Sequence, residues 1–224
     1  MNTRLKTNTN LTLFTGRYFQ GMPVQTSHGP LILSYLESMN QVLQNAVYDH
    51  KRTLAIRVDL RLPSGINCPD VPLAYDNSVI SRFVESLKAQ IKADQIKRRR
   101  LKKRSFPCSV RVIWVAERDS SMNYHYHIVI LVNNDCYRGL GDITADKENM
   151  AARIKKAWAS ALALELHEAA GLVHFTDNGV FRLDVNSKTY NEDYCNLFYA
   201  ISYLAKAKTK HFGDGSKSFG CSRN

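Results

Sequence analysis

The sequence lacks a long apolar run and lacks paired cysteines. No stretch of about eighteen consecutive apolar residues occurs in its 224 residues, so no conventional transmembrane helix is expected. The first ten residues, MNTRLKTNTN, contain no apolar core of the kind found in secretory signal peptides. The five cysteines are scattered without a C-x-x-C pair, which argues against a disulfide framework and against a zinc finger. We therefore expect a cytoplasmic protein with reduced thiols and no membrane partner.

Acidic residues are also scarce relative to basic ones. The chain has 20 Asp and Glu against 31 Lys and Arg, which gives a formal net charge of +11. A polyanion is the natural partner of such a protein, and nucleic acid is the commonest polyanion. An acidic membrane surface is the weaker alternative, because the sequence shows no basic amphipathic helix with a bulky apolar face. Hydrophobic residues make up 44% of the chain, which is enough to bury a core.

The apolar pattern predicts helices alternating with strands. Residues 1–29 contain several glycines and one proline, and we expect an extended arm with little structure of its own. Helices are predicted over 30–49, 77–104, 146–168 (ended by Gly171) and 191–208. Strands are predicted over 53–62, 108–117, 124–132, 172–176 and 179–185, with a hairpin turn at 177–179. This order is typical of an α+β fold with an antiparallel sheet flanked by helices. We place an N-terminal arm and helix in residues 1–45 and a single folded domain in residues 46–224.

The second predicted helix ends in a basic cluster, KRRRLKKR, over Lys97–Arg104. One interpretation is a solvated helix end whose cations interact favourably with the helix dipole. Seven of the eight residues are basic, however, and that number favours a phosphate-binding surface. The predicted nucleic-acid-binding residues are Lys97, Arg98, Arg99, Arg100, Lys102, Lys103 and Arg104.

Two histidines, His125 and His127, lie in the strong strand pattern YHYHIVILV. Because side chains alternate along a strand, both point to one face and could bind one divalent metal. Glu117 ends the preceding strand and would share that face if it pairs with His125, whereas a one-residue slip would turn it away. Asp119 is the alternative third ligand. The competing interpretation is a pair of half-buried histidines that make ordinary hydrogen bonds.

Tyr199, Tyr203 and Lys206 are spaced i, i+4 and i+7 in the last predicted helix and would form one stripe. A tyrosine can act as a covalent nucleophile, but its ordinary pKa of about 10 means that it needs assistance. A metal that polarises a phosphate and a lysine that stabilises negative charge would provide this. Tyrosines at this spacing also occur as simple packing residues. Their combination with the histidines and the positive charge favours a nucleophile.

Together these segments resemble the HUH endonucleases, a superfamily of rolling-circle replication initiators and relaxases. The nearest likeness is to the replication-initiation proteins of filamentous phages and their relatives in prophages and satellite elements. Residues 53–62, the segment WVAERDSSMNYHYHIVIL and the segment YAISYLAKAK resemble three family motifs in the family's order, and the terminal SFGCSR is similar to a tail common in the phage group. The resemblance covers about residues 45–224, and it implies that the domain over 46–224 is a HUH-like nicking endonuclease domain. No helicase motif follows the tyrosines, so unwinding would need a partner.

The resemblance implies an RNA-recognition-motif-like antiparallel sheet with the histidines on a central strand. It implies Mg²⁺ or Mn²⁺ held by His125, His127 and Glu117. It also implies cleavage of single-stranded DNA or an origin hairpin by Tyr203 with Lys206, leaving a 5′-phosphotyrosine and a free 3′-hydroxyl. Tyr199 would be a second nucleophile in a two-tyrosine enzyme, and a host helicase and polymerase would be partners.

Two other functions compete with nicking. A DNA-binding regulator could keep the same fold without cutting. An RNA-binding module would use aromatic side chains on a sheet, but the sequence has no aromatic-glycine motif of the kind found in RNA-recognition motifs.

Overall fold

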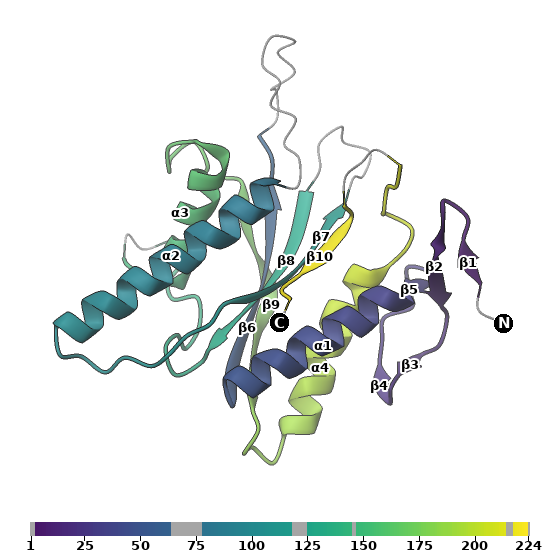
Figure 1. The fold of residues 1–224 in the computed structure, drawn as a ribbon, viewed down its shortest axis with the longest axis horizontal. Helices are drawn as coiled ribbons and strands as arrows, with labels where there is room; N and C mark the ends of the chain where they lie inside the picture. Colours follow the sequence, from purple (N-terminus) through teal and green to yellow (C-terminus); the bar gives the residue numbers. More distant parts are fainter. Residues whose placement is uncertain (1–2, 64–77, 118–124, 145–146, 214–216, 224) are drawn as a thin grey trace, which may run out of the picture.

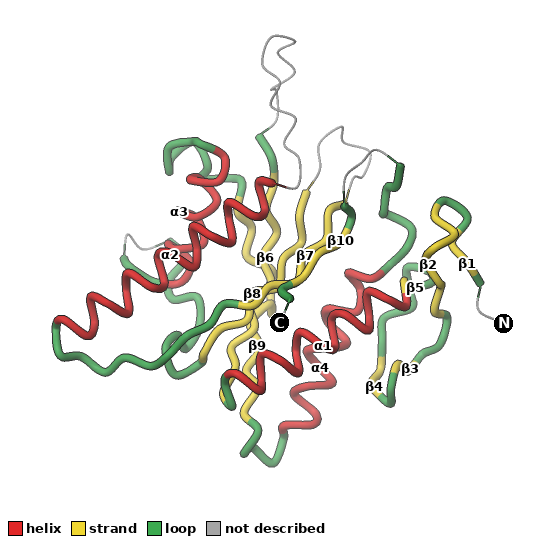
Figure 2. The backbone as a smooth tube through the Cα atoms, viewed as in Figure 1, coloured by secondary structure: helices red, strands yellow, loops and turns green. Residues whose placement is uncertain are grey.

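The computed structural model describes residues 3–63, 78–117, 125–144, 147–213 and 217–223. In these residues four α-helices accompany a five-stranded antiparallel sheet (Figures 1 and 2). The helices are α1 (Leu33–Asp49), α2 (Ser78–Arg100), α3 (Met150–Leu162) and α4 (Tyr190–Ser202). The strands, in spatial order, are β10 (Phe219–Cys221), β7 (Arg111–Glu117), β8 (His125–Asn133), β6 (Arg52–Arg61) and β9 (Val173–Asp184). Each strand is antiparallel to its neighbours, so the α+β class with an antiparallel sheet is confirmed.

The helices cover the sheet on both faces and give three layers. Helices α2 and α3 lie on one face, while α1 and α4 lie on the other (Figure 1). In β6, Leu54, Ile56 and Val58 pack in the α2/α3 core, whereas Ala55 packs in the α1/α4 core. The period of two along the strand therefore decides which residues meet which helices.

The middle strand, β8, is apolar on both faces over most of its length. Ile128 and Ile130 belong to the α2/α3 core, and Val129 and Leu131 belong to the α1/α4 core. The two histidines lie on the same α1/α4 face, at the N-terminal end of β8. The sheet thus places the histidines at the margin of a rigid, packed surface.

The expectation of an unstructured N-terminal arm was wrong. Short strands form at Arg4–Leu5 (β1), Asn8–Phe14 (β2), Tyr18–Phe19 (β3), Met22–Pro23 (β4) and Leu31–Ile32 (β5). The arm is ordered because it packs on the rest of the protein: the buried ring of Phe19 stacks on Phe198 of α4, with centroids 5.7 Å apart. The arm is thereby attached to the α1/α4 layer. The boundary predicted after residue 45 falls within α1 and stays a prediction.

The predicted hairpin at residues 177–179 was also wrong, because β9 is a single strand that carries a bulge. Its pairing with β6 jumps from Ile56↔Val180 to Val58↔Phe175, so residues 176–179 lie opposite a single residue of β6. Asn178 has a left-handed φ of 53°. At Gly179 a Cβ atom would lie 2.7 Å from the Thr176 carbonyl oxygen. Turn-forming residues here make a bulge that keeps β9 paired on both sides of it.

Three helix ends differ from the sequence prediction. Helix α3 ends at Leu162, where Ala163 adopts a left-handed φ of 55°, so Gly171 is not its terminus. Helix α2 ends at Arg100, and the rest of the basic cluster lies beyond it. Helix α4 ends at Ser202 and is followed by a 3₁₀ turn, η1 (Tyr203–Ala205).

The C-terminal segment, predicted as a tail, adds β10 to the edge of the sheet beside β7. Gly220 permits this, because a Cβ atom there would lie 2.5 Å from the Trp114 ring. Among the described residues, no helix combines the length and apolar character needed to cross a membrane.

Candidate metal centre and tyrosine

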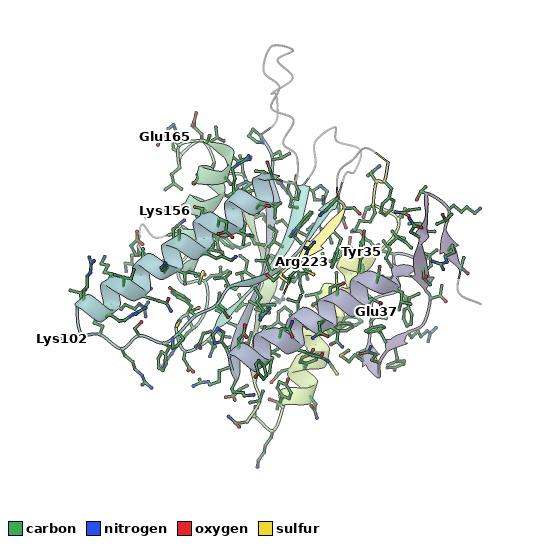
Figure 3. The ribbon with its side chains drawn as sticks, in the orientation of Figure 1. Tyr35, Glu37, Lys102, Lys156, Glu165 and Arg223 are labelled. Carbon is green, nitrogen blue, oxygen red and sulfur yellow. The ribbon has the colours of Figure 1, made fainter. Side chains whose placement is uncertain are left out.

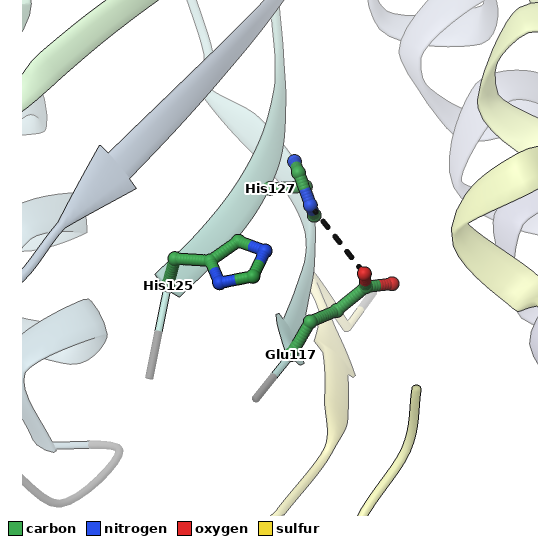
Figure 4. Close-up of side chains that lie close together, drawn as sticks. All are labelled: Glu117, His125 and His127. Carbon is green, nitrogen blue, oxygen red and sulfur yellow. Dashed lines mark ion pairs between the residues drawn. The ribbon is translucent and has the colours of Figure 1, made fainter. Parts of the chain in front are cut away.

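Glu117, His125 and His127 come together on the α1/α4 face of the sheet (Figure 4). In the β7–β8 pairing Glu117 is the direct partner of His125, which is the register that places all three side chains on one face. Their potential ligand atoms lie within 4.8 Å of one another, and His127 Nε2 is 3.5 Å from Glu117 Oε2. Asp119, the alternative third ligand, lies outside the described residues.

Asp59 orients one of the histidines. It is the direct partner of His127 in the β6–β8 pairing, and its Oδ1 lies 2.5 Å from His127 Nδ1. A carboxylate that accepts a hydrogen bond from Nδ1–H fixes the imidazole tautomer and leaves the Nε2 lone pair free for a metal. Burial alone raises the pKa of Asp59, but the hydrogen bond and charge of His127 outweigh it, so this pKa is lowered overall.

Two buried lysines neutralise Glu117. Lys206 Nζ lies 2.8 Å from Oε2, and Lys210 Nζ lies 2.6 Å from Oε1. Burial raises the pKa of Glu117, but the His127 hydrogen bond and the two ammonium groups outweigh it and hold this pKa far below its usual range. Burial also lowers the pKa of Lys210 to about 8, against the opposing attraction of Glu117.

The two histidines differ in charge preference. Burial lowers the pKa of His125, and the charge of His127 lowers it further, so His125 favours the neutral form that binds metals. For His127, burial lowers the pKa, but the hydrogen bonds to Asp59 and Glu117 more than offset burial and raise it overall. A cation entering the cluster would therefore displace a proton from His127.

Tyr203 is connected to the cluster by Lys206, which contacts both. The Lys206 ammonium is 3.6 Å from the centroid of the Tyr203 ring, a cation–π contact, while it also pairs with Glu117. The His28 and Tyr203 rings pack in an edge-to-face arrangement, with centroids 5.0 Å apart. The segment is held by the N-terminal arm, since Ala207 N–H donates to the Pro30 carbonyl at 3.0 Å.

Tyr199 is separate from this arrangement. It is 45% exposed on α4, and its carbonyl oxygen accepts a hydrogen bond from Ser202 Oγ at 2.7 Å. Within the described part of the chain it makes no hydrogen bond, ion pair or ring contact with the cluster. The prediction that Tyr199, Tyr203 and Lys206 form one stripe on a helix was wrong, because α4 ends at Ser202. Lys206 pairs with Glu117 of the cluster, and Tyr203 contacts Lys206.

Arg57 completes the polar face of β6. It pairs with Val129 of β8, so it lies two residues from Asp59 on the same face. Burial lowers its pKa, and the nearby Asp59 and Tyr203 oppose this effect. Arg57 thus offers a cation close enough to interact electrostatically with both Asp59 and Tyr203.

Sequence reasoning missed Asp59, Lys210 and Arg57. For the two β6 residues a signal existed, because both lie on the polar face of a strand whose other face is apolar. Assigning them to the cluster required knowledge that β6 is adjacent to β8. Lys210 gave no signal, since it lies in a lysine-rich segment after the last helix.

The basic cluster lies elsewhere. Lys97, Arg98, Arg99 and Arg100 form the last turn of α2, and Lys102, Lys103 and Arg104 follow it, on the side of the sheet opposite the histidines. Figure 3 shows Lys102 at the far end of α2 and Lys156 on α3, away from Tyr35 of α1. The structure therefore brings the metal candidates together with Tyr203 and Lys206, but not with the basic cluster.

Fold and site together define an α+β protein whose antiparallel sheet carries a candidate Glu/His/His metal centre. The chain belongs to the YagK/YfjJ C-terminal domain family, whose model matches residues 14–222. It is 39% identical over 202 residues to the uncharacterized protein YagK of Escherichia coli (strain K12), covering 89% of this chain and 97% of the relative. It is 31% identical over 209 residues to the uncharacterized protein YfjJ of the same organism, covering 90% and 100%. No solved structure matches the chain.

Proposed function

We propose that this protein is a HUH-type DNA endonuclease that nicks and rejoins single-stranded DNA at a specific site to initiate rolling-circle replication of a phage or mobile element. One observation carries the proposal: Lys206 links the Glu117–His125–His127 cluster to the Tyr203 ring. A metal site and a candidate nucleophile are thus joined by one cation. The position of the histidines on the middle strand of five supports an RNA-recognition-motif-like HUH arrangement.

The donor set suits a divalent cation. Two imidazole nitrogens and a carboxylate oxygen on one sheet face are ligands for such an ion, and Asp59 supplies the orienting hydrogen bond that metal-binding histidines usually have. We assign Mg²⁺ or Mn²⁺ to His125, His127 and Glu117. When bound, the ion would polarise the scissile phosphate.

The protein's own residues would perform the transfer. The Tyr203 oxygen attacks phosphorus, the bond to the 3′-oxygen breaks, and the products are a 5′-phosphotyrosine and a 3′-hydroxyl. The proton lost by the phenol ends on the departing 3′-oxygen, and the Lys206 ammonium lies beside the Tyr203 ring, where its positive charge can stabilise negative charge that develops on attack. Rejoining is the reverse: a 3′-hydroxyl attacks the phosphotyrosine and releases Tyr203. Arg57 lies on the same face, where it can contact a phosphate oxygen.

The partners follow from this role. The substrate would be single-stranded DNA or an origin hairpin. A helicase and a polymerase of the host would unwind the duplex and extend the 3′-hydroxyl, because the chain shows no helicase motif.

The second candidate is a DNA-binding regulator that does not cut. It is favoured by the ion pairs of Glu117 with Lys206 and Lys210, which give both carboxylate oxygens a charged partner without a metal ion. In that case the cluster is a structural element, and DNA binding needs no metal.

A covalent-adduct assay distinguishes the two candidates. The protein is incubated with Mn²⁺ and single-stranded oligonucleotides that tile the region around its own gene, and denaturing gels are examined for a protein–DNA adduct. Nicking predicts an adduct that Tyr203→Phe abolishes and the matched control Tyr199→Phe retains. A His125→Ala/His127→Ala protein that still forms the adduct would sink the metal assignment. The regulator predicts metal-independent DNA binding and no adduct with any oligonucleotide.

A further inference from the structure

A groove rich in arginine and lysine runs along the α2/α3 side of the protein, on the face of the sheet opposite the metal centre. Its first part is a cavity of about 580 Å³ between the end of α2 and α3. The basic residues that line this part are Lys97, Arg98, Lys103, Arg104, Arg153 and Lys156. The second part is a cavity of about 600 Å³ that shares Arg98 and Arg153 and adds Arg138 and Arg182. We call the two parts together the basic groove.

The charge of the basic groove is far from balanced. Its eight basic side chains face only two carboxylates, Asp94 and Glu148, so this region carries more than half of the formal net charge of +11. Within the described residues neither Lys103 nor Arg104 forms an ion pair, and both are exposed. The sequence cluster at the end of α2 is therefore one wall of a larger surface to which three other segments contribute.

The floor of the basic groove is ordered by buried contacts. Arg153 is 5% exposed, and its guanidinium lies 3.0 Å from Asp94 and stacks over the Tyr137 ring at 5.5 Å. Arg98 contacts the same carboxylate at 2.9 Å and the same ring at 5.5 Å. Tyr137 Oη donates to Asp94 at 2.9 Å. One carboxylate and one ring thus hold two guanidinium groups in place.

These contacts also indicate the kind of polyanion. Proteins that bind single strands without reading their sequence usually offer exposed aromatic rings on which bases stack. In the basic groove the Tyr137 ring is buried beneath two guanidinium groups. Arg104, which also lines the groove, lies over the Phe106 ring at 4.5 Å from its centroid. What the groove presents is cationic and suited to phosphates. A duplex, which has the higher charge density, fits this surface best.

The location separates this surface from the metal centre. On β8, Tyr126 and Ile128 face α2 and α3, while His125 and His127 face the other way. A sheet and its side chains therefore stand between a strand held at the metal centre and the basic groove. The groove must contact a different segment of the DNA.

We propose that the basic groove binds the backbone of duplex DNA without reading its sequence, and so holds the double-stranded part of a substrate whose single strand reaches the opposite face. The inference rests on the proposed function only in taking DNA as the polyanion. It does not require cleavage.

The test compares two triple charge reversals in the full-length chain. Lys97→Glu/Lys103→Glu/Arg104→Glu alters the groove, and Lys6→Glu/Lys51→Glu/Lys188→Glu makes the same change of charge at exposed residues outside it. Fluorescence anisotropy measures binding to a 20-base-pair DNA duplex of arbitrary sequence over a range of salt concentrations. Thermal melting checks that both proteins fold.

The groove variant should lose at least about tenfold in duplex affinity, and the slope of log affinity against log salt should fall by about 2–3 because three phosphate contacts disappear. The control variant should stay within about twofold of the wild type. Equal losses in both variants, or no loss in the groove variant, would overturn the proposal. So would tighter binding to a single strand of the same length, or binding to an RNA duplex but not to DNA.

The result of this binding test can be interpreted independently of whether the protein nicks DNA. If nicking is correct, the groove variant still forms the Tyr203 adduct on a short single-stranded oligonucleotide. If no adduct forms with any protein, the duplex-binding comparison still gives its own answer, because it measures binding alone.

Discussion

The two faces of the sheet use charge in opposite ways. On the α1/α4 face, Glu117, Lys206 and Lys210 are buried, and both ammonium groups pair with the one carboxylate at distances of 2.6–2.8 Å. On the α2/α3 face, most cations of the basic groove are exposed and outnumber the carboxylates four to one. Buried charges must be paired, so their positions are fixed well enough for chemistry, whereas exposed charges attract any polyanion. This difference supports the two proposals, specific chemistry on one face and general polyanion binding on the other.

The largest difference between the two faces is expected in the loss of stability when one carboxylate is removed from each. Glu117→Gln leaves two buried lysines without a counter-charge, and we expect it to lower the free energy of unfolding by about 3–5 kcal/mol. Glu148→Gln is the matched control, since the Glu148 side chain is 62% exposed and pairs with Lys156 at the surface, and it should cost less than about 1 kcal/mol. Urea unfolding in the presence of EDTA measures both. Equal losses in the free energy of unfolding would show that the buried ion pairs of Glu117 stabilise the fold no more than a surface ion pair does.

The orienting hydrogen bond of Asp59 gives the next largest effect. Asp59→Asn should weaken Mn²⁺ binding by about 10–100-fold, because the amide no longer accepts the His127 Nδ1–H as a carboxylate does. Asp49→Asn removes a carboxylate that pairs with Arg111 away from the cluster and should leave Mn²⁺ affinity unchanged. Isothermal titration calorimetry measures both. An unchanged affinity in Asp59→Asn would remove Asp59 from the site.

Acid should weaken the buried network in a defined direction. The pKa of Glu117 is lowered in the folded protein, so its contribution to stability is complete above the unfolded carboxyl pKa of about 4.3 and is lost as the pH falls. In EDTA, the stability difference between the wild type and Glu117→Gln should therefore narrow below about pH 4, by about 1.4 kcal/mol per pH unit. Urea unfolding at pH 7 and at pH 3 tests this. A difference that widens in acid would contradict the assignment.

A single groove cation should give the smallest effect. Lys103→Ala should reduce the salt slope of duplex binding by about 1 and leave Mn²⁺ affinity unchanged. The two readouts together test whether the faces act independently. A change in metal affinity would show that they are coupled.

The strands and helices of the core were predictable because their apolar residues repeat with clear periods. The period of two along YHYHIVILV placed both histidines on one face, and the carboxylate at the end of the preceding strand identified Glu117 as a neighbour. The N-terminal strands were missed because their order depends on long-range contacts such as Phe19 on Phe198, which no local pattern reveals.

Other parts of the site depended on topology. Asp59 reaches His127 only because β6 pairs with β8, and Lys210 reaches Glu117 only because the tertiary fold places the segment after η1 beside the end of β7. The helix containing the tyrosines was predicted too long, since its apolar spacing continues through residues that form a 3₁₀ turn. Local sequence therefore indicated several members of the Glu117–His125–His127 cluster, while the tertiary fold determined which other residues contact it.

The central claim is that Tyr203 is a nucleophile assisted by a metal held at Glu117, His125 and His127. Mass spectrometry of the adduct formed with Mn²⁺ and a single-stranded oligonucleotide tests this most directly. The account predicts a DNA fragment attached through its 5′-phosphate to the peptide that contains Tyr203. It predicts no adduct when EDTA is present during the reaction. Attachment at Tyr199, or an adduct that forms equally well in EDTA, would contradict it.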